Sequence, residues 1–203
     1  MNSFSILALS AIFALAEACA GHANAGEFWM DGVSRDSGWY DINKTWSSLD
    51  SEGNYNLNGN DVNYCWAAAG SNILSWWQNQ LPPSLQNLSE IPTGEKIYNT
   101  IRKSAVAQSG GYSVAAWQWF LHGDDIPCFK EKGGAYYTPY LSDDYLTTTG
   151  IHSLYFENIW TSRSSESLYS CLYKAMKENH CGITLSVNMG ETNHAITLWG
   201  GGI

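Results

Sequence analysis

The sequence is poor in charged residues, and its few basic residues do not cluster. Only 14% of the 203 residues are Asp, Glu, Lys or Arg, and the formal net charge is −9. An acidic chain without a Lys/Arg cluster argues against nucleic acids and anionic membrane surfaces as partners. No apolar run approaches the roughly 20 residues that a transmembrane helix needs, so we expect no stable membrane insertion. With no internal repeat and no linker-like stretch, the chain is long enough for one domain with its own core.

The longest apolar run, residues 4–16, precedes an A-x-A sequence that ends at residue 25. This arrangement is typical of a secretory signal peptide, although no Lys or Arg precedes the run. A lipoprotein leader with Cys19 lipidated is the weaker alternative, because Glu17 stands where a small residue is expected. We therefore expect a cleaved signal peptide over residues 1–25, one domain over residues 26–203, and a secreted protein.

Cysteine is scarce as well, so the chain is not a disulfide-dense scaffold. Four cysteines follow the expected leader: Cys65, Cys128, Cys171 and Cys181. Export permits disulfides, but four cysteines allow three pairings, of which a Cys171–Cys181 bridge is one. The same pair with His180 matches no zinc-binding spacing. We expect neither a metal nor a cofactor.

Helical patterns dominate the first part of the chain, and strand patterns its end. Apolar periodicity and turn residues predict helices over residues 63–80, 94–108, 113–121 and about 164–177, and strands at 151–159, 182–188 and 193–199. Helices followed by strands indicate the α+β class.

The stretch NYCWAAAGSNILSWWQNQ, residues 63–80, is the most informative one. Asn60, Asp61 and Asn63 are all good N-cap types for this helix. One face carries, at helical spacing, Cys65, Ala69, Asn72, Ile73, Trp76 and Gln80. A thiolate at a helix N-terminus is stabilised by the helix dipole, which makes Cys65 a candidate nucleophile. The plainer alternative is a buried structural cysteine.

A cysteine nucleophile needs a histidine base, which can lie far downstream in the sequence. Four histidines follow the expected leader: His122, His152, His180 and His194. His194 is the best candidate because it begins an alternating strand that can hold its ring rigidly; a half-buried strand histidine is the alternative. His122 and His180 follow predicted helices, where they suit the negative end of the helix dipole.

The reaction also needs donors for the oxyanion, and the backbone N–H of Cys65 is one. Papain-like enzymes use a glutamine before the cysteine, and none precedes Cys65 here. Lys44, in the aromatic stretch GWYDINKTW, can supply a positive charge instead; an ordinary solvated lysine is the alternative. Residues 43–45 also form a glycosylation sequon, and a glycan on Asn43 would crowd this site.

Three blocks of the sequence together resemble the IdeS/Mac family of secreted immunoglobulin-degrading cysteine proteases. They are GWYDINKTW at 38–46, CWAAAGSNILSWWQNQ at 65–80 and NHAITLWG at 193–200. The resemblance implies a papain-like fold, with an N-terminal helical part that carries the nucleophile helix and a C-terminal antiparallel sheet. It further implies a cysteine endopeptidase and virulence factor that acts on a protein substrate, immunoglobulin. Cys65 would be the nucleophile, Lys44 an oxyanion donor and His194 the base.

The sequence departs from the family at the third member of the triad. The family places an aspartate on the strand after the histidine strand, but no acidic residue follows Glu191. We expect a chain truncated at its C-terminus, with the acid beyond Ile203. Two other functions remain open: a cell-wall amidase or acyl transferase that uses the same Cys–His pair, and an inactive secreted binding protein with an aromatic recognition surface.

Overall fold

The computed structural model describes residues 26–44, 61–86, 88–106, 110–142, 168–188 and 193–201. Its elements are, in order, β1 (Phe28–Trp29), the 3-10 turn η2 (Val62–Tyr64), α1 (Cys65–Gln80), α2 (Pro83–Gln86), α3 (Glu95–Ser104), α4 (Ser113–His122), α6 (Leu168–Tyr173), the π-helical turn η4 (Lys174–Glu178), β2 (Ile183–Asn188), β3 (Asn193–Leu198) and β4 (Gly200–Gly201). The predicted α+β class is confirmed. None of the helices in these ranges is both long enough and apolar enough to cross a membrane.

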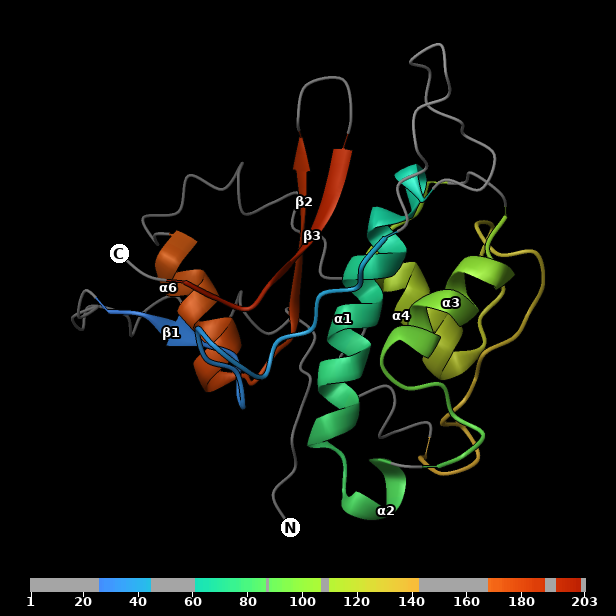
Figure 1. Ribbon diagram of the computed structural model, residues 1–203, viewed down its shortest axis with the longest axis horizontal. Coiled ribbons are helices and arrows are strands. Elements are labelled where there is room, and N and C mark those ends of the chain that lie inside the picture. The colour runs from blue at the N-terminus through green and yellow to red at the C-terminus, as the bar shows by residue number, and fades with distance from the viewer. Residues whose placement is uncertain are drawn as a thin grey trace.

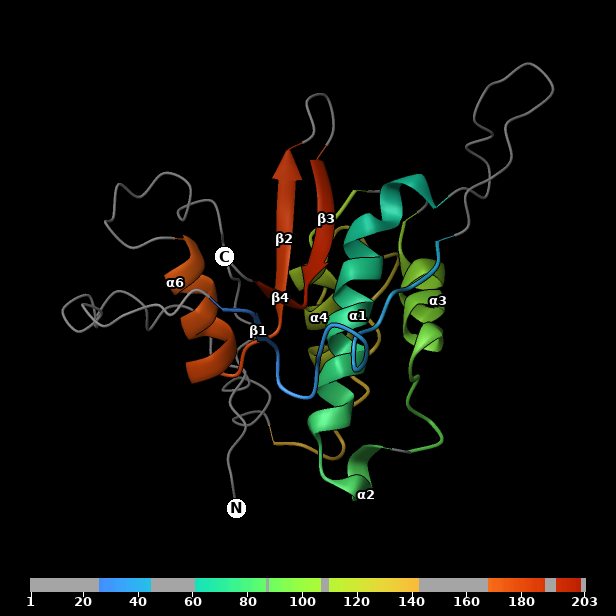
Figure 2. The same ribbon diagram turned by 60° about the vertical axis from the view of Figure 1, so that its left-hand side comes forward.

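Helix α1 runs through the middle of the molecule, with β3 on one side and α3 and α4 on the other (Figures 1 and 2). Every residue from Trp66 to Gln78 is buried, whereas Cys65 at the start of the helix is half-buried. The small residues let α4 approach closely: a Cβ on Gly70 would lie 2.9 Å from the Cβ of Ala116. The predicted helix is thus confirmed, and Cys65 is the half-buried residue at its N-terminal end.

The start of α1 differs from the prediction. The helix has Tyr64 at its N-cap position, without a side-chain cap, so the predicted capping by Asp61 or Asn63 is wrong. Asp61 is instead only 3% exposed, and its carboxylate pairs with Nε of Arg102 on α3 at 2.5 Å. A buried charge needs such a partner, because burying it alone is costly. The ion pair anchors the start of α1 to α3.

The predicted antiparallel sheet near the C-terminal end is confirmed, and it is small. Strands β2 and β3 pair antiparallel, with Val187 opposite His194. A second pair joins β1 to β4, and the Met30 N–H extends it by donating to the Trp199 carbonyl at 2.9 Å. Gly200 is needed there, since a Cβ at this position would lie 2.4 Å from the Phe28 carbonyl oxygen.

The other predicted elements fit with shifted ends. Helix α3 ends at Ser104, earlier than predicted. Helix α4 ends at His122 and is capped by Gly123, whose φ of 73° is left-handed as a C-terminal glycine allows. The helix predicted over about 164–177 is observed from Leu168 onward as α6 and η4. Its first residues and the strand predicted at 151–159 lie outside the described residues.

The disulfide considered between Cys171 and Cys181 is not formed in the structure. No disulfide joins any two of the four described cysteines, Cys65, Cys128, Cys171 and Cys181. Cys171 is half-buried in α6, whereas Cys181 is 1% exposed in the core and its Sγ donates to the Asn179 carbonyl at 3.5 Å. The close spacing of the two cysteines in sequence therefore does not bring their sulfur atoms together.

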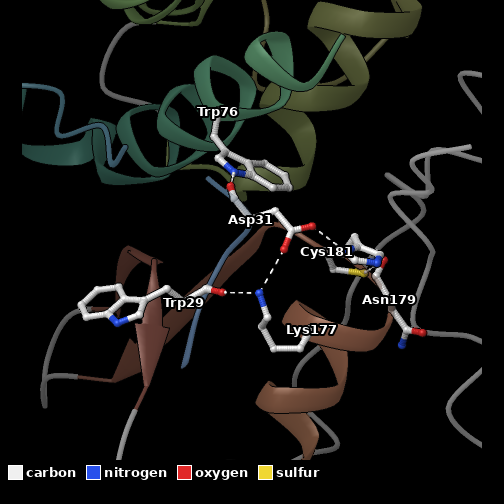
Figure 3. Close-up of polar contacts among 7 residues, drawn as sticks. Trp29, Asp31, Trp76, Lys177, Asn179 and Cys181 are labelled. Atoms are coloured by element: carbon white, nitrogen blue, oxygen red, sulfur yellow. Dashed lines mark hydrogen bonds and ion pairs between the residues drawn. The ribbon is translucent and has the colours of Figure 1, made fainter. Parts of the chain in front are cut away.

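Asp31 links the segment after β1 to two other segments of the chain (Figure 3). Its carbonyl accepts from Nε1 of Trp76 on α1 at 2.8 Å. Its carboxylate accepts from Nζ of Lys177 at 3.1 Å and pairs with Nδ1 of His180. Burial by itself would raise the pKa of Asp31, but the hydrogen bonds and positive charges of Lys177 and His180 outweigh it and lower the pKa. Asp31 thus holds the segment after β1 against both α1 and η4.

The lowered pKa makes the contribution of Asp31 to stability pH-dependent. Its carboxylate stabilises the folded state above its unfolded pKa, and this contribution is lost as the pH falls through the folded pKa. We expect Asp31→Asn to lower the free energy of unfolding by about 1 kcal/mol or less at neutral pH, because solvent screens the pair. The difference from wild type should shrink in acid.

Urea denaturation of both proteins from about pH 7 down to about pH 3 measures this difference. Asp36→Asn is the matched control, because this exposed carboxylate lies in the same segment. Equal stabilities of wild type and Asp31→Asn at neutral pH, or a difference that stays constant in acid, would show that Asp31 has no such role.

Candidate active site

Cys65 is the first residue of α1, and the backbone of β3 lies directly against its sulfur. The Ala195 N–H donates to Cys65 Sγ at 3.5 Å. Ala195 follows His194 in the strand, so the contact places the histidine position beside the thiol. The half-buried sulfur thus lies at a helix N-terminus and against a main-chain N–H donor of the histidine strand.

Lys44 lies at the end of the described segment 26–44, and its ammonium nitrogen is buried. Burial is the larger cause that lowers the pKa of His194, and the positive charge of Lys44 is the second. A charge interaction of this kind requires the two side chains to be near each other. The contact between Ala195 and Cys65 and the effect of the Lys44 charge on His194 thus connect the three predicted site residues, which belong to three separate segments.

The lowered pKa leaves the His194 imidazole neutral near pH 7, the form that accepts a proton from a thiol. No carboxylate of the described residues contributes to the shift. The local environment of His194 is set by burial and by a cation. Neither of these two influences is a hydrogen bond from the imidazole ring to a carboxylate, the interaction that orients the histidine in a catalytic triad.

Asn72 links the segments that carry the candidate site residues, a connection that the sequence analysis missed. It lies two helical turns after Cys65 on the same face of α1 and is 7% exposed. Its Oδ1 accepts from the Ile42 N–H at 3.1 Å, and its Nδ2 donates to Thr197 Oγ1 at 3.1 Å. The helical periodicity placed Asn72 on the same helix face as Cys65. The hydrogen-bond partners of Asn72 belong to distant segments, which the periodicity does not identify.

The remaining histidines lie elsewhere. His122 is in the last turn of α4, as predicted, and His180 pairs with Asp31 instead of a helix end. His152 lies outside the described residues. Within the described ranges, no three His, Cys, Asp or Glu side chains gather where they could hold a metal ion.

Comparison with known proteins gives one family match, which covers part of the chain. Residues 19–105 match the family model described as Mac 1. The predicted resemblance to the IdeS/Mac family is confirmed over this part of the chain, which contains Lys44 and Cys65 but not His194. No curated protein and no solved structure gives a significant match.

Proposed function

We propose that this Mac 1-like protein is a secreted cysteine endopeptidase of papain-like fold. Residues 1–25 would serve as its cleaved signal peptide and residues 26–203 as its protease domain. One observation carries the proposal: the N–H that follows His194 touches Cys65 Sγ, while the buried charge of Lys44 acts on His194. These two interactions support a site near the start of α1 in which Cys65 would be the nucleophile, His194 the base and Lys44 the cation.

In the proposed mechanism, His194 takes the proton of the Cys65 thiol, and Sγ attacks the carbonyl carbon of the scissile peptide bond. The negative charge on the carbonyl oxygen is stabilised by the Cys65 N–H and the Lys44 ammonium. The C–N bond then breaks, and the imidazolium of His194 gives its proton to the leaving amine. Water, deprotonated by His194, attacks the thioester, the C–S bond breaks, and the acid product leaves with the thiol restored.

The burial of Lys44 suits this role. A buried cation is screened less than one in water, so it interacts more strongly with an oxyanion that forms beside it. The same charge disfavours the imidazolium form of His194, which makes that imidazolium a stronger acid toward the leaving amine.

We further propose immunoglobulin as the substrate, on the basis of the three sequence blocks and the Mac 1 match. The test is incubation with intact immunoglobulin, with casein and with peptidoglycan, followed by gel electrophoresis and mass spectrometry. Discrete large immunoglobulin fragments support the proposal. Cleavage of casein alone would keep the protease but overturn the substrate, and release of peptidoglycan peptides without protein cleavage would indicate a cell-wall amidase.

Replacing Lys44 tests the oxyanion role directly. Lys44→Met should lower kcat about 10²-fold, the usual effect of losing one oxyanion donor. It should also raise the pKa of His194, because the cation that disfavours imidazolium is removed while burial still lowers the pKa. An NMR titration of His194 in the Cys65→Ala background measures the second effect.

Lys96→Met is the matched control, since Lys96 is exposed on α3. It should leave both kcat and the His194 titration unchanged. A Lys44→Met enzyme with wild-type kcat would limit Lys44 to a structural role.

A further inference from the structure

We propose that Asn72 is a positioning residue that keeps the proposed nucleophile, cation and base in register. The inference rests on the proposed function of Cys65, Lys44 and His194. Asn72 does not touch the reacting atoms in this account; it acts through the segments that carry them.

The amide of Asn72 joins all three segments. It belongs to α1, the helix that begins at Cys65. Its Oδ1 accepts from Ile42 N, two residues before Lys44, and its Nδ2 donates to Thr197 Oγ1, three residues after His194. Both distances are 3.1 Å. One side chain therefore holds the lysine segment and the histidine strand against the nucleophile helix.

Hydrogen-bond chemistry allows only one orientation of this amide. A backbone N–H can only donate, so the amide oxygen of Asn72 must face Ile42 and its NH₂ group must face β3. Thr197 Oγ1 donates in turn to the Ala69 carbonyl at 3.4 Å, which leaves its lone pairs for Asn72. The network is directional, and a reversed amide would place two donors against each other.

The position of Asn72 along the helix lets it hold strand β3 at a second point, away from Cys65. It lies seven residues after Cys65, about 10 Å along the axis at 1.5 Å per residue. Helix α1 and strand β3 are thus joined at two levels, by Cys65 with Ala195 and by Asn72 with Thr197. One hydrogen bond would leave the strand free to rotate about that point relative to the helix. Two hydrogen bonds at separate positions restrict both the angle between strand and helix and the shift of one along the other. A displacement of about 1 Å at a reacting group can cost on the order of 10²-fold in rate.

Four variants test the inference. Asn72→Leu keeps the approximate volume and removes both hydrogen bonds of the amide. Thr197→Val removes the bond between Asn72 and β3, together with the bond from Thr197 to the Ala69 carbonyl, and leaves the bond between Asn72 and Ile42 in place. Ser75→Ala is the matched control, because this buried hydroxyl one turn further along α1 donates only to Ser71 O at 2.9 Å, within the same helix. We expect Asn72→Leu to lower kcat roughly 10-fold or more with little change in KM. Thr197→Val should have a smaller effect of the same kind, and Thr197→Ser and Ser75→Ala should retain wild-type kcat.

A second readout separates positioning from plain stability. In the Cys65→Ala background, adding Lys44→Met should shift the NMR titration of His194, and adding Asn72→Leu first should reduce that shift. This coupling needs no substrate, so a wild-type protein that cleaves nothing would defeat the proposed function while the titration still tested Asn72.

Wild-type kcat together with an unreduced Lys44–His194 coupling in Asn72→Leu would overturn the inference. If Asn72→Leu does not fold, Thr197→Val decides in its place. That variant overturns the inference if both its kcat and its coupling match wild type.

Discussion

Replacing Cys65 with alanine should abolish peptide-bond cleavage and leave the fold intact. The substitution removes the sulfur that would form the thioester, and no other group of the proposed site can replace it. Alanine is a favourable helix residue, and Cys65 is half-buried at the end of α1, so little packing is lost. The measurements are kcat on the protein substrate and the midpoint of thermal unfolding.

Cys128→Ala is the control for this experiment. Cys128 is also a half-buried thiol, but burial raises its pKa, which makes it a poor nucleophile. We expect Cys128→Ala to keep wild-type activity. Measurable cleavage by a purified Cys65→Ala protein would remove Cys65 from the mechanism.

Replacing His194 with glutamine should lower kcat about 10³-fold, within the range that general acid–base catalysis contributes. Glutamine approximates the length of the side chain but cannot carry a proton between the thiol and the leaving amine. The side chain is partly exposed on β3, so the strand should tolerate the change. The kcat/KM profile against pH should also lose the inflection that His194 causes.

His122→Gln is the matched control, because His122 is likewise partly exposed but ends α4. It should leave kcat and the pH profile unchanged. A His194→Gln enzyme within a few-fold of wild type would require another base.

Much of the fold follows from local sequence patterns. The small and apolar residues of 65–80 predict a helix that other elements can approach closely, and α1 has this form, with Gly70 against Ala116. The alternation at 193–199 likewise predicts β3, and Gly123 predicts the end of α4. In each case the residues that predict the element lie in that element or next to it in the sequence.

The wrong sequence predictions concern side chains whose partners in the structure lie far away in the sequence. Asp61 has the chemistry of an N-cap, but its carboxylate pairs with Arg102, which belongs to another helix. Cys171 and Cys181 are close in sequence and remain separate thiols, because one lies in α6 and the other is buried in the core. Local spacing specifies neither outcome.

In the candidate site, too, some groups could be predicted from the sequence and others could not. Cys65, Lys44 and His194 could be named from residue type, order and family resemblance, because each would carry a distinct chemical role. The Ala195 N–H and the Asn72 amide could not, since a backbone donor has no sequence signature and a buried asparagine is defined by its partners. The papain-like fold itself remains a proposal.

The most direct test of the account is the alkylation of the folded protein by iodoacetamide near neutral pH, followed at each cysteine by peptide mass spectrometry. We expect Cys65 to be modified faster than Cys128, Cys171 or Cys181, because in the proposed mechanism His194 takes the proton of its thiol. Protease activity should fall in proportion to the modified fraction of Cys65. A protein that still cleaves its substrate after complete modification of Cys65 would contradict the assignment of Cys65 as the nucleophile.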